Sequence, residues 1–211
     1  MEALLQRTYD LINQTWTTFI HQVGNGILEI NKEASMQLNY AYLLRNALPL
    51  IIFDKDEEVE IELERGIKIN GRLRECDVIV SITKSEEKLH IPIEMKCYKK
   101  YASSGGLRGA KDIFYKDLYE DLELLEGYSQ NEGYLNGIQL TMTDFRSIAF
   151  PTTKNGKYFD YDITDGHEIN NGIELNTPIG GKEIDIKLKG SYQFKWQELN
   201  EFYFLKLHNN G

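Results

Sequence analysis

Residues 76–82 read CDVIVSI and residues 89–98 read LHIPIEMKCY. Both stretches are rich in β-branched and aliphatic residues, and the charged connector TKSEEK separates them. This pattern predicts two neighbouring β-strands joined by a polar loop. The strands carry Asp77, Glu94 and Lys96, and the interpretation of the whole chain starts from these three side chains.

The spacing of the three residues predicts that their side chains converge. Side chains alternate between the two faces of a strand, so Glu94 and Lys96 share one face while Met95 and Cys97 share the other. If Asp77 pairs near Glu94, two carboxylates and one ammonium group meet at one end of the sheet. Mg²⁺ prefers oxygen ligands and keeps several waters, so Asp77 and Glu94 are enough to hold it. This combination is suited to metal-assisted hydrolysis of phosphodiester bonds.

Lys96 has more than one possible role in such a site. A bound metal polarises the phosphate, lowers the pKa of a bound water and neutralises charge that develops in the transition state. Lys96 would orient that water or deprotonate it, and deprotonation requires a pKa depressed by burial or by nearby cations. Otherwise it binds the phosphate as a cation.

At these residues the sequence resembles the PD-(D/E)XK nuclease superfamily, also called restriction-endonuclease-like. The family signature is an acid on one strand followed by (D/E)-x-K on the next, here Asp77 and Glu94-Met95-Lys96. The resemblance implies a core of helix, three strands, helix and strand, with the metal held by Asp77, Glu94 and the backbone carbonyl of Met95. It also implies an auxiliary glutamate from the first helix of that core, matched by Glu33. Cys76 stands where the family often has proline.

Glu94 and Glu33 each also have a purely structural explanation. Glu-x-Lys can be an ion pair on the solvent-facing side of a strand. Glu33 can be an acid in the first turn of a helix, favoured by the helix dipole after a capping Asn31. Glu29 is an alternative source of the auxiliary ligand.

Length and composition favour one globular domain. The chain has 211 residues, 41% of them hydrophobic, and no apolar run approaches the ~20 residues of a membrane span. The N-terminal residues lack the pattern of a signal peptide, so we expect a cytoplasmic protein without membrane association. Cys76 and Cys97 are expected to be buried, reduced thiols that point away from the catalytic face.

Motifs for other cofactors are not supported. The four histidines show no zinc-ligand spacing. The segment GGLRGAK at residues 105–111 lacks the spacing and the ending of a phosphate-binding P-loop, so no nucleotide cofactor is implied. The expected cofactor is Mg²⁺, with Mn²⁺ as a substitute.

Charge is distributed unevenly along the chain. The net charge of −9 argues against a protein that coats nucleic acid non-specifically. Residues 96–116, however, contain six basic residues and one acid. Lys99, Lys100, Arg108 and Lys111 in this stretch are the candidate nucleic-acid-binding residues. The segment at 98–109 is either a flap that closes over phosphates or a solvated connector.

The pattern predicts an α/β fold in two parts. Residues 1–150 form the nuclease-like core, with an N-terminal helix over 3–23, a helix ending near Leu48, a strand over 58–64 with a turn at 65–66, a helix over 110–126 whose acids and tyrosines are mostly on the surface, and a strand over 137–143. Residues 151–211 form a β-rich extension packed on the core, with strands that include 157–163. Tyr192, Phe194 and Trp196 share a face that is either buried or a stacking platform for bases.

The functional hypothesis is therefore a Mg²⁺-dependent endonuclease that hydrolyses nucleic acid, DNA above all, in restriction, defence or repair. Asp77, Glu94, Lys96 and Glu33 form the catalytic set. Cutting of both strands of a duplex would imply a homodimer, because one site faces one strand. The alternative is a catalytically inactive protein of the same fold that binds nucleic acid or a protein partner.

Overall fold

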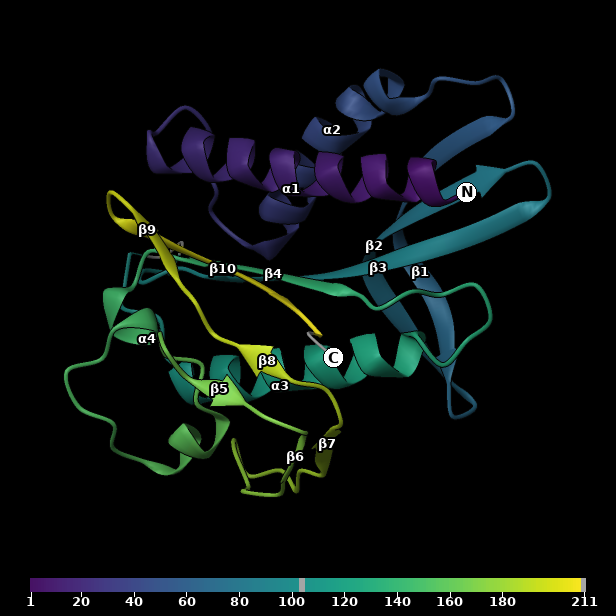
Figure 1. Ribbon diagram of the computed structural model, residues 1–211. Helices are drawn as coiled ribbons and strands as arrows, with labels where there is room; N and C mark the ends of the chain where they lie inside the picture. Colours follow the sequence, from purple (N-terminus) through teal and green to yellow (C-terminus); the bar gives the residue numbers. More distant parts are fainter. Residues whose placement is uncertain (103–104, 210–211) are drawn as a thin grey trace.

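A mixed six-stranded sheet forms the middle layer, with helices on both faces (Figure 1). The computed structural model describes residues 1–102 and 105–209. The helices are α1 (Glu2–Gly24), α2 (Glu33–Ala47), α3 (Lys111–Tyr128) and α4 (Arg146–Ala149), and the short 3-10 helices are η1 (Leu48–Ile51) and η2 (Lys157–Tyr161). The strands are β1 (Glu57–Ile69), β2 (Arg72–Lys84), β3 (Glu87–Tyr98), β4 (Ile138–Thr143), β5 (Glu168–Ile169), β6 (Ile173–Leu175), β7 (Ile186–Leu188), β8 (Tyr192–Gln193), β9 (Gln197–Leu199) and β10 (Phe202–His208).

The strand order in the large sheet is β1-β2-β3-β4-β10-β9. Neighbours are antiparallel except β3 and β4, which are parallel. A parallel pair needs a crossover, and α3 supplies it on one face of the sheet. The expected α/β class is therefore confirmed at the level of a mixed sheet flanked by helices. Across residues 1–102 and 105–209, no helix is both long and apolar enough to cross a membrane.

Two apolar cores lie on opposite faces of the sheet. The first packs α1 and α2 against alternate residues of the central strands, among them Ile93, Met95 and Cys97 of β3. The second packs α3 and much of the C-terminal segment against the other face. Because side chains alternate along β3, Glu94 and Lys96 point toward α3. This alternation is the reason that the polar residues of the Glu-x-Lys motif meet side chains of that helix.

The C-terminal segment contributes strands to the same sheet. β10 pairs with β4, from Tyr203 opposite Thr143 to His208 opposite Ile138, and β9 pairs with β10. The aromatic residues at 192, 194 and 196 are 3%, 0% and 6% exposed, so their shared face is buried rather than a stacking platform. The predicted strand over 157–163 is wrong, because residues 157–161 form η2 and residues 162–163 are not in a strand. Tyr161 packs edge-on against Tyr119 of α3.

Two further expectations about the central strands need correction. β1 does not turn at residues 65–66 but continues to Ile69, still paired with β2. Glu64, in a left-handed conformation with φ of 53°, is the one position of this ladder without a partner. Cys97 packs on the α1 and α2 side as expected, but Cys76 belongs to the core on the α3 side. Both cysteines are buried and free.

Candidate active site

Asp77 and Glu94 lie side by side where β2 and β3 stop pairing. The last pair of the ladder is Val78 with Ile93, so Asp77 and Glu94 occupy the next position, where the strands separate. The backbone N–H of Met95 donates to Oδ2 of Asp77 at 2.6 Å. The N–H and C=O of one strand residue point toward the same neighbour, so the Met95 carbonyl also faces the Asp77 side. The structure thus brings together the three predicted ligand positions.

Gln37 of α2 holds the backbone at Asp77. Its Nε2 donates to the carbonyl oxygen of Asp77 at 2.7 Å and to Oε1 of Glu64 at 2.8 Å. This side chain replaces the cross-strand hydrogen bond that the unpaired Glu64 does not provide. β3 therefore contacts the carboxylate of Asp77, and α2 holds its backbone.

Glu94 is almost fully buried, with 4% of its surface exposed. The hydroxyl of Tyr128, at the end of α3, donates to Oε1 of Glu94 at 2.9 Å. Among the described residues, the Glu94 carboxyl has one other hydrogen-bond partner, the side chain of Asp77. A buried acid with so few donors retains capacity to bind a cation.

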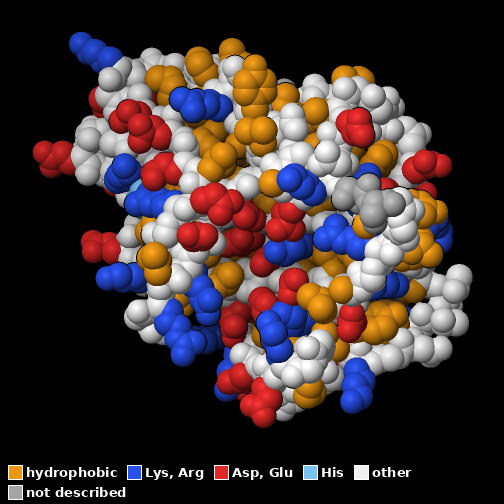
Figure 2. All heavy atoms as spheres, turned by 180° about the vertical axis from the view of Figure 1, so that it is seen from behind, with side chains coloured by type: hydrophobic (Ala, Val, Ile, Leu, Met, Phe, Trp, Pro, Cys, Tyr) orange, Lys and Arg blue, Asp and Glu red, His pale blue; other side chains and the backbone are white. Residues whose placement is uncertain are grey.

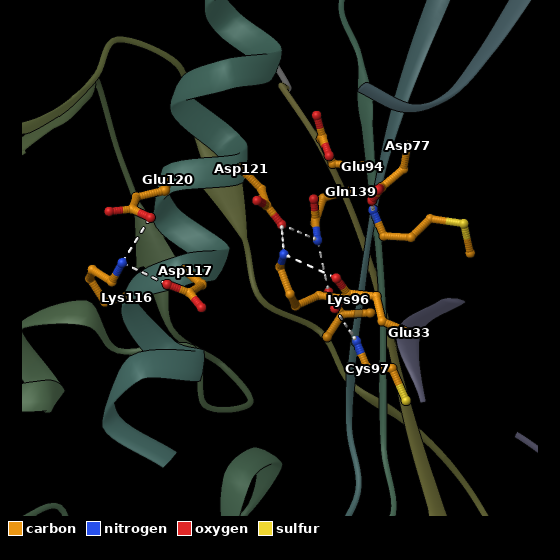
Figure 3. Close-up of polar contacts among 12 residues, drawn as sticks. Glu33, Asp77, Glu94, Lys96, Cys97, Lys116, Asp117, Glu120, Asp121 and Gln139 are labelled. Carbon is orange, nitrogen blue, oxygen red and sulfur yellow. Dashed lines mark hydrogen bonds and ion pairs between the residues drawn. The ribbon is translucent and has the colours of Figure 1, made fainter. Parts of the chain in front are cut away.

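Lys96 lies between two carboxylates from different helices (Figure 3). Its Nζ is 3.3 Å from Oδ2 of Asp121 on α3 and 3.6 Å from Oε1 of Glu33 on α2. Its side chain is 18% exposed. The ammonium group is thus held in a fixed position with one side open to solvent.

Glu33 is the first residue of α2, and its side chain crosses to β3. Oε2 accepts a hydrogen bond from the backbone N–H of Cys97 at 3.2 Å. Lys32, rather than Asn31, is the N-cap residue of α2, and the hydroxyl of Ser35 in the first turn accepts the N–H of Lys32. Glu33 therefore joins the site, and the purely structural explanation by a capping Asn31 does not account for its contacts.

Asp121 and Gln139 belong to the site although the motif does not include them. Nε2 of Gln139 donates to Oδ2 of Asp121 at 3.3 Å, and Gln139 is the partner of Glu94 in the β3–β4 ladder. Oε1 of Gln139 is buried and has no hydrogen-bond partner among the described residues. The expectation that the acids and tyrosines of this helix are on the surface is wrong for Asp121 and for the fully buried tyrosines at 115, 119 and 128.

A signal for Asp121 was present in the sequence. It lies three residues after Leu118 and four before Leu125, on the apolar stripe of the helix. An acid on that stripe must face the sheet, where only a polar partner or a bound cation makes its burial tolerable.

The site carries an excess of negative charge. Burial, more than any other cause, raises the pKa of Asp77 to about 6 and that of Asp121 to about 7, although Met95 and Lys96 respectively act in the opposite direction. Burial and the charges of Asp121 and Asp77 raise the pKa of Glu94 well above its usual range. Burial alone would lower the pKa of Lys96, but the surrounding carboxylates outweigh it and raise that pKa above its ordinary value.

The donor set fits a hard divalent cation. Asp77, Glu94 and the Met95 carbonyl offer only oxygen atoms, and four acids surround a single ammonium group, so a divalent cation would relieve their repulsion. No group of three or more His, Cys, Asp or Glu side chains forms a ready-made metal site within the described part of the chain. Mg²⁺ held here would therefore keep several waters or take phosphate oxygens, as it commonly does.

Of the four predicted nucleic-acid-binding residues, Lys99 and Lys100 lie just beyond the site. Nζ of Lys99 forms an ion pair of 2.8 Å with Asp144, and the Lys100 ammonium lies 5.2 Å from the centre of the Tyr101 ring. Figure 2 shows the face opposite to that of Figure 1, where acidic side chains gather near the centre with basic side chains close beside them. The charge of Lys99 is therefore balanced by Asp144, whereas the Lys100 ammonium lies beside an aromatic ring.

Arg108 and Lys111 are the other two. Arg108 is exposed and its guanidinium carbon lies 5.3 Å from the centre of the Tyr98 ring. Lys111 instead donates to the carbonyl of Ser147 at 2.7 Å and lies near three aromatic rings. Its ammonium is turned toward the protein, so Arg108 is the better placed of the two for a ligand. Two residues of the predicted flap, 103 and 104, lie outside the described residues.

No protein-family model, no curated protein and no solved structure matches this chain. The resemblance to the PD-(D/E)XK superfamily therefore depends on the motif and on the geometry described above.

Proposed function

We propose that this protein is a Mg²⁺-dependent nuclease with a restriction-endonuclease-like core, and that it hydrolyses phosphodiester bonds in nucleic acid, DNA above all. One observation carries the proposal: Glu33, Asp77, Glu94 and Asp121, from two helices and two strands, surround Lys96. The element order α2, β1, β2, β3, α3, β4 agrees with the core that the resemblance implies and adds support.

In this proposal Asp77, Glu94 and the Met95 carbonyl would hold the metal ion, which would supply a Lewis acid for the scissile phosphate and a water of lowered pKa. Lys96 stays protonated, because its ammonium is paired with Asp121 and Glu33. It therefore acts as a hydrogen-bond donor to a phosphate oxygen or to the attacking water, and not as the base. Of the roles left open by the sequence, the geometry favours these two.

Glu33 has a different part from the metal ligands. It keeps one oxygen on the Cys97 N–H and the other near Lys96, and its side chain is 41% exposed. A carboxylate in that position can accept a proton from a water on the solvent side of the site. Asp121 and Tyr128 act through their neighbours, as positioning residues for Lys96 and Glu94.

The test is cleavage of plasmid DNA, linear duplex, single-stranded DNA and RNA with Mg²⁺ or Mn²⁺, and with EDTA. Wild type is compared with Lys96→Ala and with Lys116→Ala. Lys116 is the matched control because it also pairs with two acids, Asp117 and Glu120, but lies away from the site on α3 (Figure 3). Metal-dependent cleavage that Lys96→Ala removes and Lys116→Ala retains is the expected result. Equal activity in all three proteins rejects the proposal.

The non-catalytic alternative gives a different result in the same experiment. A binding module would cleave none of the substrates, and its thermal stability would not depend on Mg²⁺ through Asp77. Folding of each variant is checked by circular dichroism, so that a loss of activity is not mistaken for a loss of structure.

A further inference from the structure

A groove with a volume of about 860 Å³ lies next to the site. One wall is formed by residues between α1 and α2, among them Leu28 and Lys32, and the other by four residues that follow β3: Lys99, Tyr101, Ala102 and Arg108. Phe202 of β10 also lines it. Lys32 in one wall directly precedes Glu33 of the site, and Lys99 in the other follows Lys96 by three residues. A chain molecule bound in the groove would therefore lead into the site.

The charge of the groove is opposite to that of the protein as a whole. Lys32, Lys99 and Arg108 line it together with a single acid, Glu29, in a protein of net charge −9. Lys99 is paired with Asp144, so Lys32 and Arg108 are the cations that remain for a ligand. Basic side chains in a groove beside the acidic site favour binding of a polyanion. One phosphate of that polyanion would lie at the metal, and its other phosphates would lie along the groove. The ligand class that this favours is a phosphodiester chain.

The groove also has apolar and aromatic surface, which phosphates do not need. Tyr101 is 53% exposed, with the Lys100 ammonium 5.2 Å from its ring centre. The ring of Phe202 is beneath the Lys99 ammonium, 4.8 Å from the ring centre. Aromatic rings combined with cations are the arrangement with which proteins bind unpaired bases, because every base has a face that can stack. In a duplex those faces are covered by neighbouring bases.

We propose that this groove binds one strand of nucleic acid, with phosphates at Lys32 and Arg108 and an unpaired base against Tyr101. This rests on the proposed nuclease function and specifies its substrate as single-stranded nucleic acid or an unpaired end. The volume lies within the range of about 300–1,000 Å³ typical of sites for small ligands, which suits a short stretch of one strand. A single-strand substrate also needs only one active site.

The experiment measures binding separately from cleavage. Lys96→Ala protein in EDTA is titrated into a fluorescein-labelled single-stranded DNA oligonucleotide, and into the same oligonucleotide annealed to its complement. Fluorescence anisotropy gives both dissociation constants. We expect the single strand to bind at least about tenfold more tightly than the duplex. In the same background, Tyr101→Ala is expected to weaken single-strand binding about tenfold and to leave duplex binding unchanged.

Tyr42→Ala is the matched control, because Tyr42 is another exposed tyrosine, 65% accessible on α2, that does not line the groove. It is expected to bind like its parent. Arg108→Gln is expected to weaken binding and to reduce its dependence on salt by about one counterion. Equal affinity for duplex and single strand, or equal effects of the two tyrosine variants, overturns the proposal.

The two proposals fail in different ways. If single strands bind through Tyr101 but wild type cleaves nothing with any metal, the groove assignment stands and the nuclease function falls. If wild type cleaves duplex DNA and Tyr101→Ala cleaves it equally well, the nuclease function stands and the single-strand groove falls.

Discussion

Nζ of Lys96 lies 3.3 Å from Oδ2 of Asp121, so a residue of α3 fixes the lysine of the strand motif. Asp121 in turn accepts a hydrogen bond from Gln139 of β4. The Glu94-x-Lys96 motif is therefore held by the crossover helix and by the parallel strand that follows it. A substitution of Asp121 on α3 should therefore change the rate of catalysis by changing the position of Lys96.

Asp121→Asn is expected to lower kcat about 10- to 100-fold and to change KM little. The amide still fills the space beside Lys96 but no longer forms an ion pair that orients the ammonium group. The orientation of that group affects kcat because the ammonium stabilises charge that develops in the transition state. Steady-state kinetics with a cleavable oligonucleotide measures kcat and KM separately. Asp117→Asn, one turn earlier on the same helix and paired with Lys116, is the control and should retain wild-type kcat. A change confined to KM, or equal effects of both variants, contradicts the positioning role.

Asp77→Asn is expected to remove stabilisation by Mg²⁺. The amide oxygen can still accept the Met95 N–H, but the ligand charge is gone. A bound metal stabilises the folded state in proportion to the logarithm of its concentration over its Kd, about 3 kcal/mol at a hundredfold excess. In EDTA the variant should be more stable than wild type by on the order of 1–3 kcal/mol, because the raised pKa of Asp77 marks an unfavourable buried charge.

Thermal unfolding in EDTA and in millimolar Mg²⁺ measures both effects of Asp77→Asn. Glu62→Gln, on the surface of β1 in an ion pair with Arg65, is the control and should keep the metal-induced shift. The same Mg²⁺ shift in Asp77→Asn as in wild type would show that Asp77 does not bind the metal.

Much of the site was predictable because its signal is local. Alternation along residues 89–98 correctly placed Glu94 and Lys96 on one face and Met95 and Cys97 on the other, since the period of a strand is two. The neighbouring Asn31 suggested Glu33 in the first turn of a helix, and α2 begins at Glu33. These features depend on neighbours in sequence, and the structure agrees with them.

The remainder depends on contacts between distant segments. Asp121 reaches the site only because α3 crosses the face of the sheet on which Lys96 lies. Cys76 departs from alternation because the ladder is interrupted at Asp77, opposite the left-handed Glu64. Residues 157–161 have a strand-like composition but form η2, which places Tyr161 against α3. In each case tertiary packing outweighs local propensity.

Tyr128→Phe is expected to raise the Mg²⁺ concentration required for half-maximal cleavage several-fold. The hydroxyl of Tyr128 donates to Oε1 of Glu94, and its loss favours the protonated, non-ligating form of that acid. Tyr115→Phe is the control, because it removes a buried hydroxyl that donates to the carbonyl of Ile148, away from the site. Both variants should lose about 1–3 kcal/mol of stability, but only Tyr128→Phe should change the metal requirement. A metal titration of cleavage that gives the same midpoint for both variants contradicts the role of Tyr128.

Glu57→Gln is expected to reduce stability at neutral pH and to have no effect near pH 2. The carboxylate of Glu57 accepts hydrogen bonds from the N–H of Phe53, from Lys84 and from Arg7, and these contacts lower its pKa to about 2 from an ordinary 4.5. A lowered pKa in the folded state means that the stabilisation is fully present above about pH 4.5 and is lost as pH falls toward 2. Chemical unfolding as a function of pH should therefore show the two proteins converging in acid. Glu58→Gln, on the exposed side of the same strand, should follow wild type throughout, and a Glu57→Gln deficit that stays constant down to pH 2 would contradict this account.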